Sequence, residues 1–417
     1  MHNVAEVVGG PSQAGLVAHQ RSAQLGHQRR PRTLPRNPRA GARVKCHRLP
    51  RRTLLIHAAE TSAWTNVQIH MDQLLRHHGD VDATPGLLDF AVNVRGSGPP
   101  AWLRDRLIAA LDGLGCYPSA AQDAAARVAV AARHGRDPAE VLVLGGVAEG
   151  FALLPALAPR SAVVVHPSFT EPEVALCRAG IAVRRVFTDA AHRLQPERIP
   201  TEADLVVLGN PTNPTSVLHT AEVVRGLARP GRVLVVDEAF ADAVPGERES
   251  LAADRRTPGL LVFRSLTKTW AIPGLRAGYA LGAPDLLARL TAPRPPWPVG
   301  TMVLEAVRAC SAPAAVAEAA AAAAQVVRHR EWMAHQLADL PGVTIHQPAA
   351  APFLLLHVPA GERVRAELFD AGIAVRRADT FPGLSQDHLR VAVRPPEIAG
   401  ALVDGLRAAL ATVEAAV

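Results

Sequence analysis

"RVLVVDEA" at residues 232–239 is an apolar run that ends in two acidic residues. Four further runs of this kind are "VLVLGG" (141–146), "SAVVVHP" (161–167), "DLVVLGN" (204–210) and "LLVFRS" (260–265). Helix-like stretches, such as 147–158 and 219–229, separate most of them. Strands that are apolar throughout and alternate with helices are typical of a parallel sheet that is covered on both faces. The sequence therefore predicts an α/β fold with a mostly parallel sheet between helices.

The pattern changes after about residue 296. A long Ala-rich helix at about 312 to 340 precedes the short strands "FLLLHV" and "HLRVAVR" and a final helix, which predicts a smaller C-terminal α+β domain. The Pro-rich stretch "TAPRPPWPVG" (291–300) marks the junction. The predicted domains follow chain order: an N-terminal arm at 71–100, a large cofactor-binding domain at 101–295 and a small domain at 296–417.

The basic character of the chain is concentrated in its first residues. Residues 1–59 hold eleven Arg or Lys and one acid, a balance of +10, so the remaining residues carry −3 of the net +7. This segment is broken by prolines and lacks apolar periodicity, which predicts that residues 1–70 are a disordered or non-native extension and that the working protein begins near Met71. Its composition also fits a transit peptide. It shows no helix-turn-helix pattern, and we expect no nucleic-acid partner.

Other classes are disfavoured by composition. No apolar run reaches the length that spans a membrane, so we expect no membrane association. The four cysteines are widely spaced, without CxxC or a Cys/His cluster, which predicts neither disulfides nor a metal site. A reducing, cytoplasmic location fits this usage.

Polar motifs follow the apolar runs directly. "GGVAEG", "NPTNPT", "DEAF" and "RSLTK" each begin where a predicted strand ends. Ligands of open α/β sheets bind at the carboxyl ends of the strands. We therefore expect one site along this edge, made by Asn213, Asp237, Ser265, Thr267 and Lys268.

The lysine in "RSLTK" is unusual for this chain. Only Lys45 and Lys268 are lysines, and arginine stands at every other strongly basic position. Lysine differs from arginine because it can lose its proton and become a nucleophilic amine, which bonds to carbonyl carbon. The sequence therefore raises the possibility that Lys268 bonds to a carbonyl carbon, such as the aldehyde of pyridoxal 5'-phosphate.

Neighbouring residues supply the other groups that this cofactor requires. Its ring nitrogen needs a carboxylate, which Asp237 can provide, and its phenolic oxygen needs a donor such as Asn213. Its phosphate can bind to the glycine-rich turn "GGVAEG" together with hydroxyl groups and Arg276. Phe169 in "HPSFTEP" can stack on the ring. Taken singly, each has an ordinary structural role: Asp237 as a helix cap, Asn213 in a turn, Arg276 on the surface and Phe169 in the core. The joint pattern favours the cofactor site.

These motifs resemble those of the class I and II aminotransferases, which are pyridoxal-phosphate enzymes of fold type I. The resemblance runs from about Asp80 to the C-terminus, and rests on "NPTNPT", "DEAF" and "SLTKTWAIPGLRAGY" in the family's order and spacing. It implies a homodimer with shared active sites. It assigns the covalent bond to Lys268, the ring-nitrogen contact to Asp237, the phenolic contact to Asn213 and the stacking ring to Phe169. The phosphate contacts that it implies are the backbone amides of Val147 and Ala148, the side chains of Ser265, Thr267 and Arg276, and Tyr117 of the neighbouring subunit.

The same resemblance implies substrate contacts. Arg390 in "LRVAVR" matches the arginine that binds the substrate carboxylate, and Asn93 is kept in "FAVNVRGSGPP". There are departures: Phe240 stands where many relatives have a tyrosine that contacts the phenolic oxygen, Arg95 and Gly96 replace Asn-Pro, and Ser216 replaces glycine.

The chain resembles the branch that holds histidinol-phosphate aminotransferase and threonine-phosphate decarboxylase. Arg394, Arg376 and "HHGDV" (77–81) resemble the decarboxylase more, and place His77 near the substrate phosphate, with His78 as second choice. The sequence thus predicts decarboxylation of threonine phosphate to aminopropanol phosphate for cobalamin. The alternative is transamination of histidinol phosphate or an aromatic amino acid.

Overall fold

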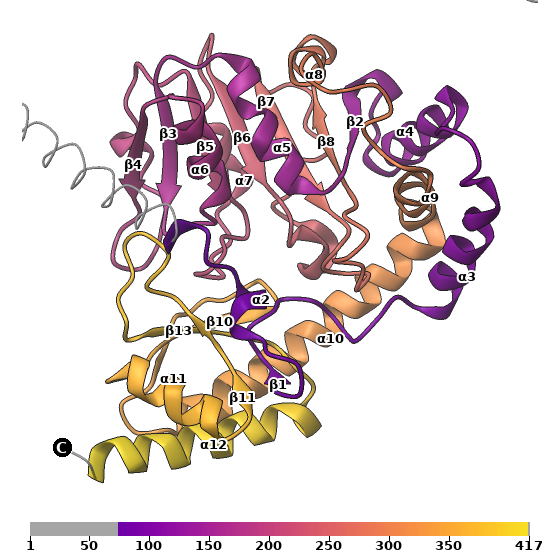
Figure 1. Cartoon of the computed structure of the whole chain (residues 1–417). Coiled ribbons are helices and arrows are strands. Elements are labelled where there is room, and N and C mark those ends of the chain that lie inside the picture. Colours follow the sequence, from indigo (N-terminus) through magenta and orange to yellow (C-terminus); the bar gives the residue numbers. More distant parts are fainter. Residues whose placement is uncertain (1–73, 416–417) are drawn as a thin grey trace, which may run out of the picture. The chain divides into compact units, whose positions relative to one another are not determined.

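Seven strands form the central sheet of the computed structural model, which describes residues 74–415 (Figure 1). Their order across the sheet is β2-β8-β7-β6-β5-β3-β4, and only β8 runs against its neighbours. The strands are β2 (Val141–Leu144), β3 (Ala162–His166), β4 (Val183–Phe187), β5 (Leu205–Gly209), β6 (Val233–Asp237), β7 (Leu260–Ser265) and β8 (Gly278–Gly282). The predicted α/β fold with a mostly parallel sheet is confirmed. The predicted extension at 1–70 lies outside the described residues.

Helices cover both faces of this sheet. Leu234 and Val236 of β6 pack into a core shared with α4 and α9, while Val235 packs into a second core with α5 and α8. A strand whose successive side chains face two buried layers must be apolar throughout, which is the pattern seen in the sequence. The helices around the sheet are α3 (Ala101–Ala110), α4 (Ala120–His134), α5 (Val147–Leu153), α6 (Glu171–Arg178), α7 (Ala221–Arg225), α8 (Pro284–Thr291) and α9 (Thr301–Cys310).

The ends of α4 show how the sequence determines where a helix begins and ends. Ser119 and Gln122 form a reciprocal capping box at its start, so two amide groups that lack helical partners are satisfied. Gly135 ends it in the left-handed conformation, with φ of 62°, which glycine adopts without steric cost.

A second, smaller layer of structure follows. An antiparallel sheet in the order β12-β13-β10-β9 packs with α11 and α12 around its own core. The elements are β9 (Thr344–Ile345), β10 (Phe353–His357), α11 (Gly361–Asp370), β11 (Ile373–Ala374), β12 (Arg376–Arg377), β13 (His388–Ala392) and α12 (Pro396–Ala415). The predicted Ala-rich helix is α10 (Pro313–Ala338), which runs from the core of the large sheet to the core of the small one (Figure 1).

The N-terminal arm joins the small sheet's side of the molecule. After α2 (Gly79–Asp82), β1 (Leu88–Asp89) pairs in parallel with β11. Short 3-10 helices complete the chain: η1 (Leu111–Gly113), η2 (Pro138–Glu140), η3 (Leu154–Leu157), η4 (Pro196–Arg198), η5 (Ala241–Ala243) and η6 (Pro245–Glu247). The domain boundaries given above remain a prediction.

Two strands carry no clear signal in the sequence. β4, "VRRVF", is an edge strand with one exposed and one half-buried arginine, and β8, "GYALG", contains two glycines. Its Gly278 is needed because a Cβ there would lie 2.7 Å from the backbone oxygen of Arg264 on β7.

Within residues 74–415, no single helix has the length and apolar composition to cross a membrane. By the same measure, the pair α9 and α10 passes only when the two are taken together across a bend of 71°.

Candidate active site

The motifs that follow β2, β3, β5, β6 and β7 converge on one cavity of about 440 Å³. They meet because these motifs fall at one edge of the sheet, where the carboxyl ends of its parallel strands lie. Most of the residues singled out from the sequence line this cavity: Asn93, Val147, Ala148, Phe169, Asn213, Asp237, Ser265, Thr267, Lys268, Arg276, Arg376 and Arg390. His77 and Tyr117 are not among its lining residues.

Lys268 and Asp237 both line the cavity. Burial, together with the nearby cations Arg390 and Arg276, lowers the pKa of Lys268 to about 8, and Asp237 acts in the opposite direction. Burial also raises the pKa of Asp237 to about 7, although its carboxylate accepts a hydrogen bond from the Ala239 amide at 3.0 Å. The site therefore holds an amine that is partly neutral, and so nucleophilic, near neutral pH.

The side of the cavity nearest α5 offers hydrogen-bond donors. The hydroxyl groups of Ser265 and Thr267 lie 2.8 Å apart. Arg276 has φ of +59°, and a Cβ at Gly146 would lie 3.1 Å from Arg276 Nη2. A glycine at 146 therefore leaves room for this guanidinium beside the start of α5, where the first amides lack helical partners. Two hydroxyls, a cation and free amides form a set that suits a phosphate.

Arg390 connects the small sheet to the motif after β5. It donates to Asn213 Oδ1 at 2.6 Å and to the Ala91 carbonyl at 2.5 Å, and Asn93, with its amide turned to satisfy both groups, accepts from it at 3.2 Å. Its guanidinium lies over the Phe353 ring, 5.4 Å from the centroid. Burial lowers the pKa of Arg390 to about 9. A buried cation therefore lines the cavity beside Asn213.

The other predicted substrate residues surround α2. His78, the second choice from the sequence, lines the cavity: its ring lies 5.3 Å from that of Phe169 and its Nε2 is 2.6 Å from Glu171. His77 instead contacts Asp82 at 3.1 Å. The buried Arg376 donates to the His77 carbonyl at 2.6 Å and to Thr380 at 2.7 Å, so most of its donors already have protein partners.

Two further predicted residues lie away from the cavity. Tyr117 is 73% exposed, and its ring stacks on Trp297 at 4.3 Å between centroids. Arg394 donates to the backbone carbonyls of Asp89, Val92 and Val94, so its role in this structure is to hold the N-terminal arm.

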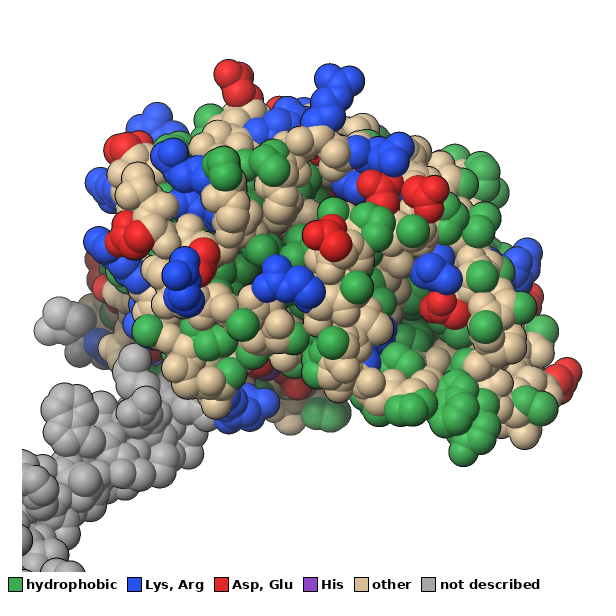
Figure 2. All heavy atoms as spheres, turned by 90° about the horizontal axis from the view of Figure 1, so that it is seen from above, with side chains coloured by type: hydrophobic (Ala, Val, Ile, Leu, Met, Phe, Trp, Pro, Cys, Tyr) green, Lys and Arg blue, Asp and Glu red, His purple; other side chains and the backbone are tan. Residues whose placement is uncertain are grey.

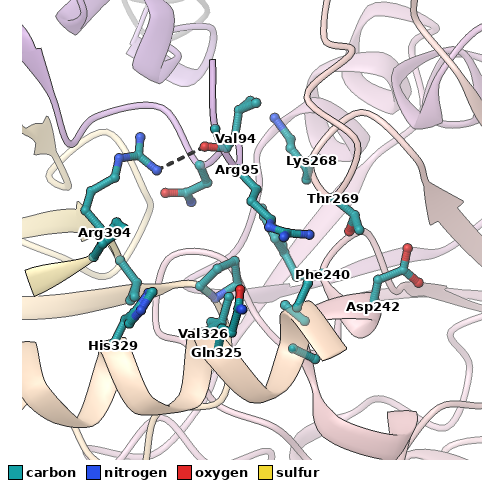
Figure 3. Close-up of a pocket in the computed structure, with 18 of the residues that line it drawn as sticks. Val94, Arg95, Phe240, Asp242, Lys268, Thr269, Gln325, Val326, His329 and Arg394 are labelled. Atoms are coloured by element: carbon teal, nitrogen blue, oxygen red, sulfur yellow. Dashed lines mark hydrogen bonds between the residues drawn. The ribbon is translucent and has the colours of Figure 1, made fainter. Parts of the chain in front are cut away.

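A second cavity of about 660 Å³ adjoins the first and shares Asn93, Val94, Phe240 and Lys268 with it (Figure 3). It is lined by Lys268 and Phe240 on one side and by the α10 residues Gln325 and His329 on another. The Arg95 amide donates to the Lys268 carbonyl at 3.0 Å, which ties this segment to the lysine. Phe240, which replaces the common tyrosine, packs edge-on against Phe353 at 4.9 Å.

Known proteins are similar to this chain in sequence and in fold. The family described as "Aminotransferase class I and II" matches residues 87–405. The chain belongs to this pyridoxal-phosphate-dependent family. Among curated proteins it is 54% identical to a histidinol-phosphate aminotransferase of Mycobacterium tuberculosis, over 77% of this chain and 87% of that protein.

Two other similarities fall in the same branch of the family. A threonine-phosphate decarboxylase of Salmonella typhimurium is 32% identical over 74% of this chain and 87% of its own length. The solved histidinol-phosphate aminotransferase of Sinorhizobium meliloti, a complex with pyridoxal-5'-phosphate, is 20% identical; it covers 77% of this chain and 90% of its own, with a TM-score of 0.69. The predicted fold type and branch are thereby confirmed.

The donor set of the cavity fits the family's cofactor. It contains a primary amine of lowered pKa, a carboxyl group of raised pKa and a group of phosphate donors, in one enclosure walled by Phe169. The site roles of the individual residues remain predictions. Phe381 and Pro273 also line the cavity, and neither was singled out from the sequence.

The lowered pKa of Lys268 leads to a prediction about cofactor binding. Because only the neutral amine attacks an aldehyde, reconstitution of cofactor-free protein should quicken as pH rises to about 8 and change little above it. An unperturbed lysine would give a rate that still rises near pH 10. Stopped-flow absorbance after mixing with pyridoxal 5'-phosphate measures this, and a rate that climbs steadily past about pH 9 would contradict it.

Proposed function

We propose that this chain transfers the amino group of histidinol phosphate to a 2-oxo acid. Support comes from the 54% identity to a histidinol-phosphate aminotransferase, against 32% to a threonine-phosphate decarboxylase. The sequence alone led to the decarboxylase, and these similarities favour the alternative. The observation that carries the proposal is the buried Arg390 beside Asn213, in the cavity that holds Lys268.

The chemistry divides between cofactor and protein. The bound cofactor supplies a ring that withdraws electrons from the carbon bearing the substrate's amino group. Asp237 would hold a proton on the ring nitrogen. The neutral Lys268 amine would take the proton from the substrate carbon that bears the amino group, and its ammonium form would donate that proton to the carbon of the cofactor's aldehyde group, for which its lowered pKa suits it. Phe169 and Phe151 exclude water from one side of the cavity.

Arg390 can serve both half-reactions. Histidinol phosphate carries its phosphate on the carbon next to the amine-bearing carbon, and a 2-oxo acid carries its carboxylate next to the carbonyl carbon. One buried guanidinium can therefore orient either substrate in turn.

Replacing Arg390 with lysine should raise the KM for both substrates by roughly 10- to 100-fold, because a single ammonium cannot form the paired hydrogen bonds of the guanidinium. Steady-state kinetics with each substrate varied in turn measures the effect. As a control, Arg407→Lys changes an exposed arginine on α12 and should leave both KM values alone. A change confined to one substrate would contradict the shared role.

Decarboxylation of threonine phosphate remains a second candidate. It is favoured by Arg376, a second buried cation in the cavity wall, since threonine phosphate carries two anionic groups. Two incubations separate the candidates: histidinol phosphate with 2-oxoglutarate should give glutamate, while threonine phosphate should give no CO2. Release of CO2 from threonine phosphate without a keto acid would overturn the main proposal in favour of the second.

We also infer that the enzyme works as a cytoplasmic homodimer with shared sites. Tyr117 and Trp297 form an exposed aromatic pair, and Ile108, Leu111 and Leu114, which shortly precede Tyr117 in the chain, are each at least 50% exposed. Figure 2 shows hydrophobic side chains at the right-hand edge of the molecule, the side on which Figure 1 draws α3 and α4. Sedimentation of the wild type and of Leu114→Glu tests this: a monomeric wild type would contradict it.

A further inference from the structure

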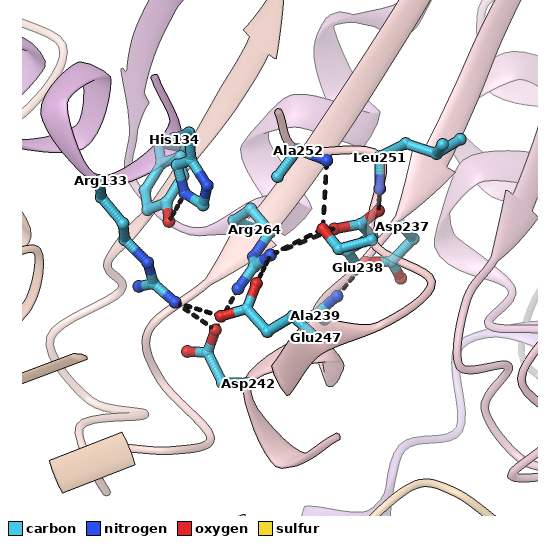
Figure 4. Close-up of polar contacts among 12 residues, drawn as sticks. Arg133, His134, Asp237, Glu238, Ala239, Asp242, Glu247, Leu251, Ala252 and Arg264 are labelled. Atoms are coloured by element: carbon cyan, nitrogen blue, oxygen red, sulfur yellow. Dashed lines mark hydrogen bonds and ion pairs between the residues drawn. The ribbon is translucent and has the colours of Figure 1, made fainter. Parts of the chain in front are cut away.

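Behind the candidate site lies a buried network of charges that no step of the proposed reaction uses (Figure 4). It is on the face of the sheet that packs against α4, and its members are Arg133, Glu238, Asp242, Glu247 and Arg264. Arg264 and Glu238 are each 1% exposed. Taking such groups out of water is costly unless every one is paired, so their retention needs a reason.

Arg264 is the centre of this network. Its Nη1 donates to Glu247 at 2.6 Å and to Glu238 at 3.1 Å, and its Nη2 donates to Asp242. Arg133 of α4 forms ion pairs with Asp242 and Glu247, at 2.8 and 2.7 Å, and within residues 74–415 it forms no ion pair with Glu238. One guanidinium therefore fixes three carboxylates, of which Glu238 directly follows Asp237 in the motif that ends β6.

The Arg264–Glu238 pair lies directly behind groups that face the cavity. Glu238 follows Asp237 at the end of β6, and Arg264 precedes Ser265 at the end of β7. The main chain joins the same two strand ends, since the Glu238 amide donates to the Phe263 carbonyl at 2.9 Å. Because alternate residues of a strand point to opposite faces, Arg264 and Glu238 meet on one face while Ser265 and Asp237 point to the other.

Glu238 also accepts hydrogen bonds from the loop that contains Ser250 and Leu251. Its carboxylate accepts from the Leu251 amide at 2.6 Å and from the Ser250 hydroxyl at 2.5 Å. Asp242 lies in η5, which packs against α10. The ends of β6 and β7 are thus bound to each other and to the loops around them.

We propose that Arg264 is a positioning residue that sets the spacing between Asp237 on one strand end and Ser265, Thr267 and Lys268 on the next. Its guanidinium binds Glu238 on the face of the sheet away from the cavity, and so holds the ends of β6 and β7 together. The Asp237 carboxylate and the Lys268 amine would therefore meet the cofactor at a fixed separation. The proposal rests on the cofactor site of the proposed function, but not on which substrate is used.

Three variants of the holoenzyme test this. Arg264→Met removes the cation and the fork, Arg264→Lys keeps the cation and loses the fork, and Arg133→Met removes a cation of the same network that does not pair with Glu238. The readouts are the pH titration of the bound cofactor's visible absorption, the dissociation constant of pyridoxal 5'-phosphate and the unfolding midpoint, none of which requires a substrate.

A positioning role predicts that both Arg264 variants weaken cofactor binding by roughly tenfold or more and shift the titration by about one pH unit. Arg133→Met should lower the unfolding midpoint about as much as Arg264→Met does. The titration of its bound cofactor should nevertheless stay within about 0.3 pH units of wild type. Should Arg264→Met fail to fold, Arg264→Lys still decides the question.

Two results would overturn the proposal. If Arg264→Lys restores the wild-type titration and affinity, charge alone acts and the fork does not position the strands. If Arg133→Met shifts the titration as much as Arg264→Met, the network acts as a whole and Arg264 has no special place. A substrate different from histidinol phosphate would leave all three readouts unchanged, so failure of the proposed function is distinguishable.

Discussion

The Lys268→Arg enzyme is expected to be inactive, with turnover reduced by roughly 10³-fold or more, although the substitution preserves charge. Arginine cannot lose its proton at any usable pH, so it can neither bond to the cofactor's aldehyde nor take a proton from the substrate. Steady-state kinetics and the visible absorption of the reconstituted protein measure the effect. The band of covalently bound cofactor should be missing in this variant and in Lys268→Ala.

The control for this experiment places a lysine elsewhere in the same cavity. Arg276→Lys should weaken cofactor binding but keep the covalent band, since Lys268 is still present. Retention of the band in Lys268→Arg would show that another amine carries the cofactor. A wild type that stays colourless with added pyridoxal 5'-phosphate would refute the cofactor site itself.

The wild type and Lys268→Arg also differ in pH dependence. The folded pKa of Lys268, about 8, is below the ordinary value of 10.5, so between these pH values the unfolded chain binds more protons and the cofactor-free wild type gains stability as pH rises. Lys268→Arg stays charged next to Arg390 and Arg276 and lacks this gain. Thermal unfolding at about pH 7 and pH 10 should therefore separate wild type from Lys268→Arg more at the higher pH.

Much of this fold could be predicted because its strands are buried on both faces. β6 reads as one apolar run, and the polar residues that end it fall at the sheet edge where ligands gather. β4 and β8 were not predicted because their composition differs from that of a buried strand: β4 carries two arginines at the edge of the sheet, and β8 contains two glycines.

The site could be predicted where residues act through local motifs, and less where distant segments meet. His77 and His78 are adjacent in sequence, and only the turn into α2 decides that His78 faces Phe169 while His77 faces Asp82. Arg264 looks like one more residue of an apolar strand. Its importance depends on carboxylates that arrive from 17 to 26 residues away, and no spacing rule brings these together.

Asp237→Asn is expected to lower kcat by roughly 10²- to 10³-fold, because a neutral amide cannot hold the proton on the cofactor's ring nitrogen. Asparagine has the same size and can still accept from the Ala239 amide, so the local fold should persist. Cofactor binding should weaken by a smaller factor than turnover falls, since the other contacts of the ring and phosphate remain. Rapid-mixing kinetics with saturating cofactor measures the loss.

The same substitution should make the cofactor-free protein more stable above neutral pH. The folded pKa of Asp237, about 7, lies above the ordinary value of 3.8, so the folded protein binds more protons between these pH values and loses stability as pH rises through that range. The neutral amide of the Asp237→Asn variant does not titrate and avoids this loss. At about pH 8 the substitution should therefore add up to about 4 kcal/mol to the free energy of unfolding, and at about pH 4 almost nothing. If Asp237→Asn instead lowered the free energy of unfolding equally at both pH values, burial would not raise the pKa of the Asp237 carboxyl group. A gain in stability together with a loss of turnover would show that the ionised Asp237 is kept for catalysis at the expense of the fold.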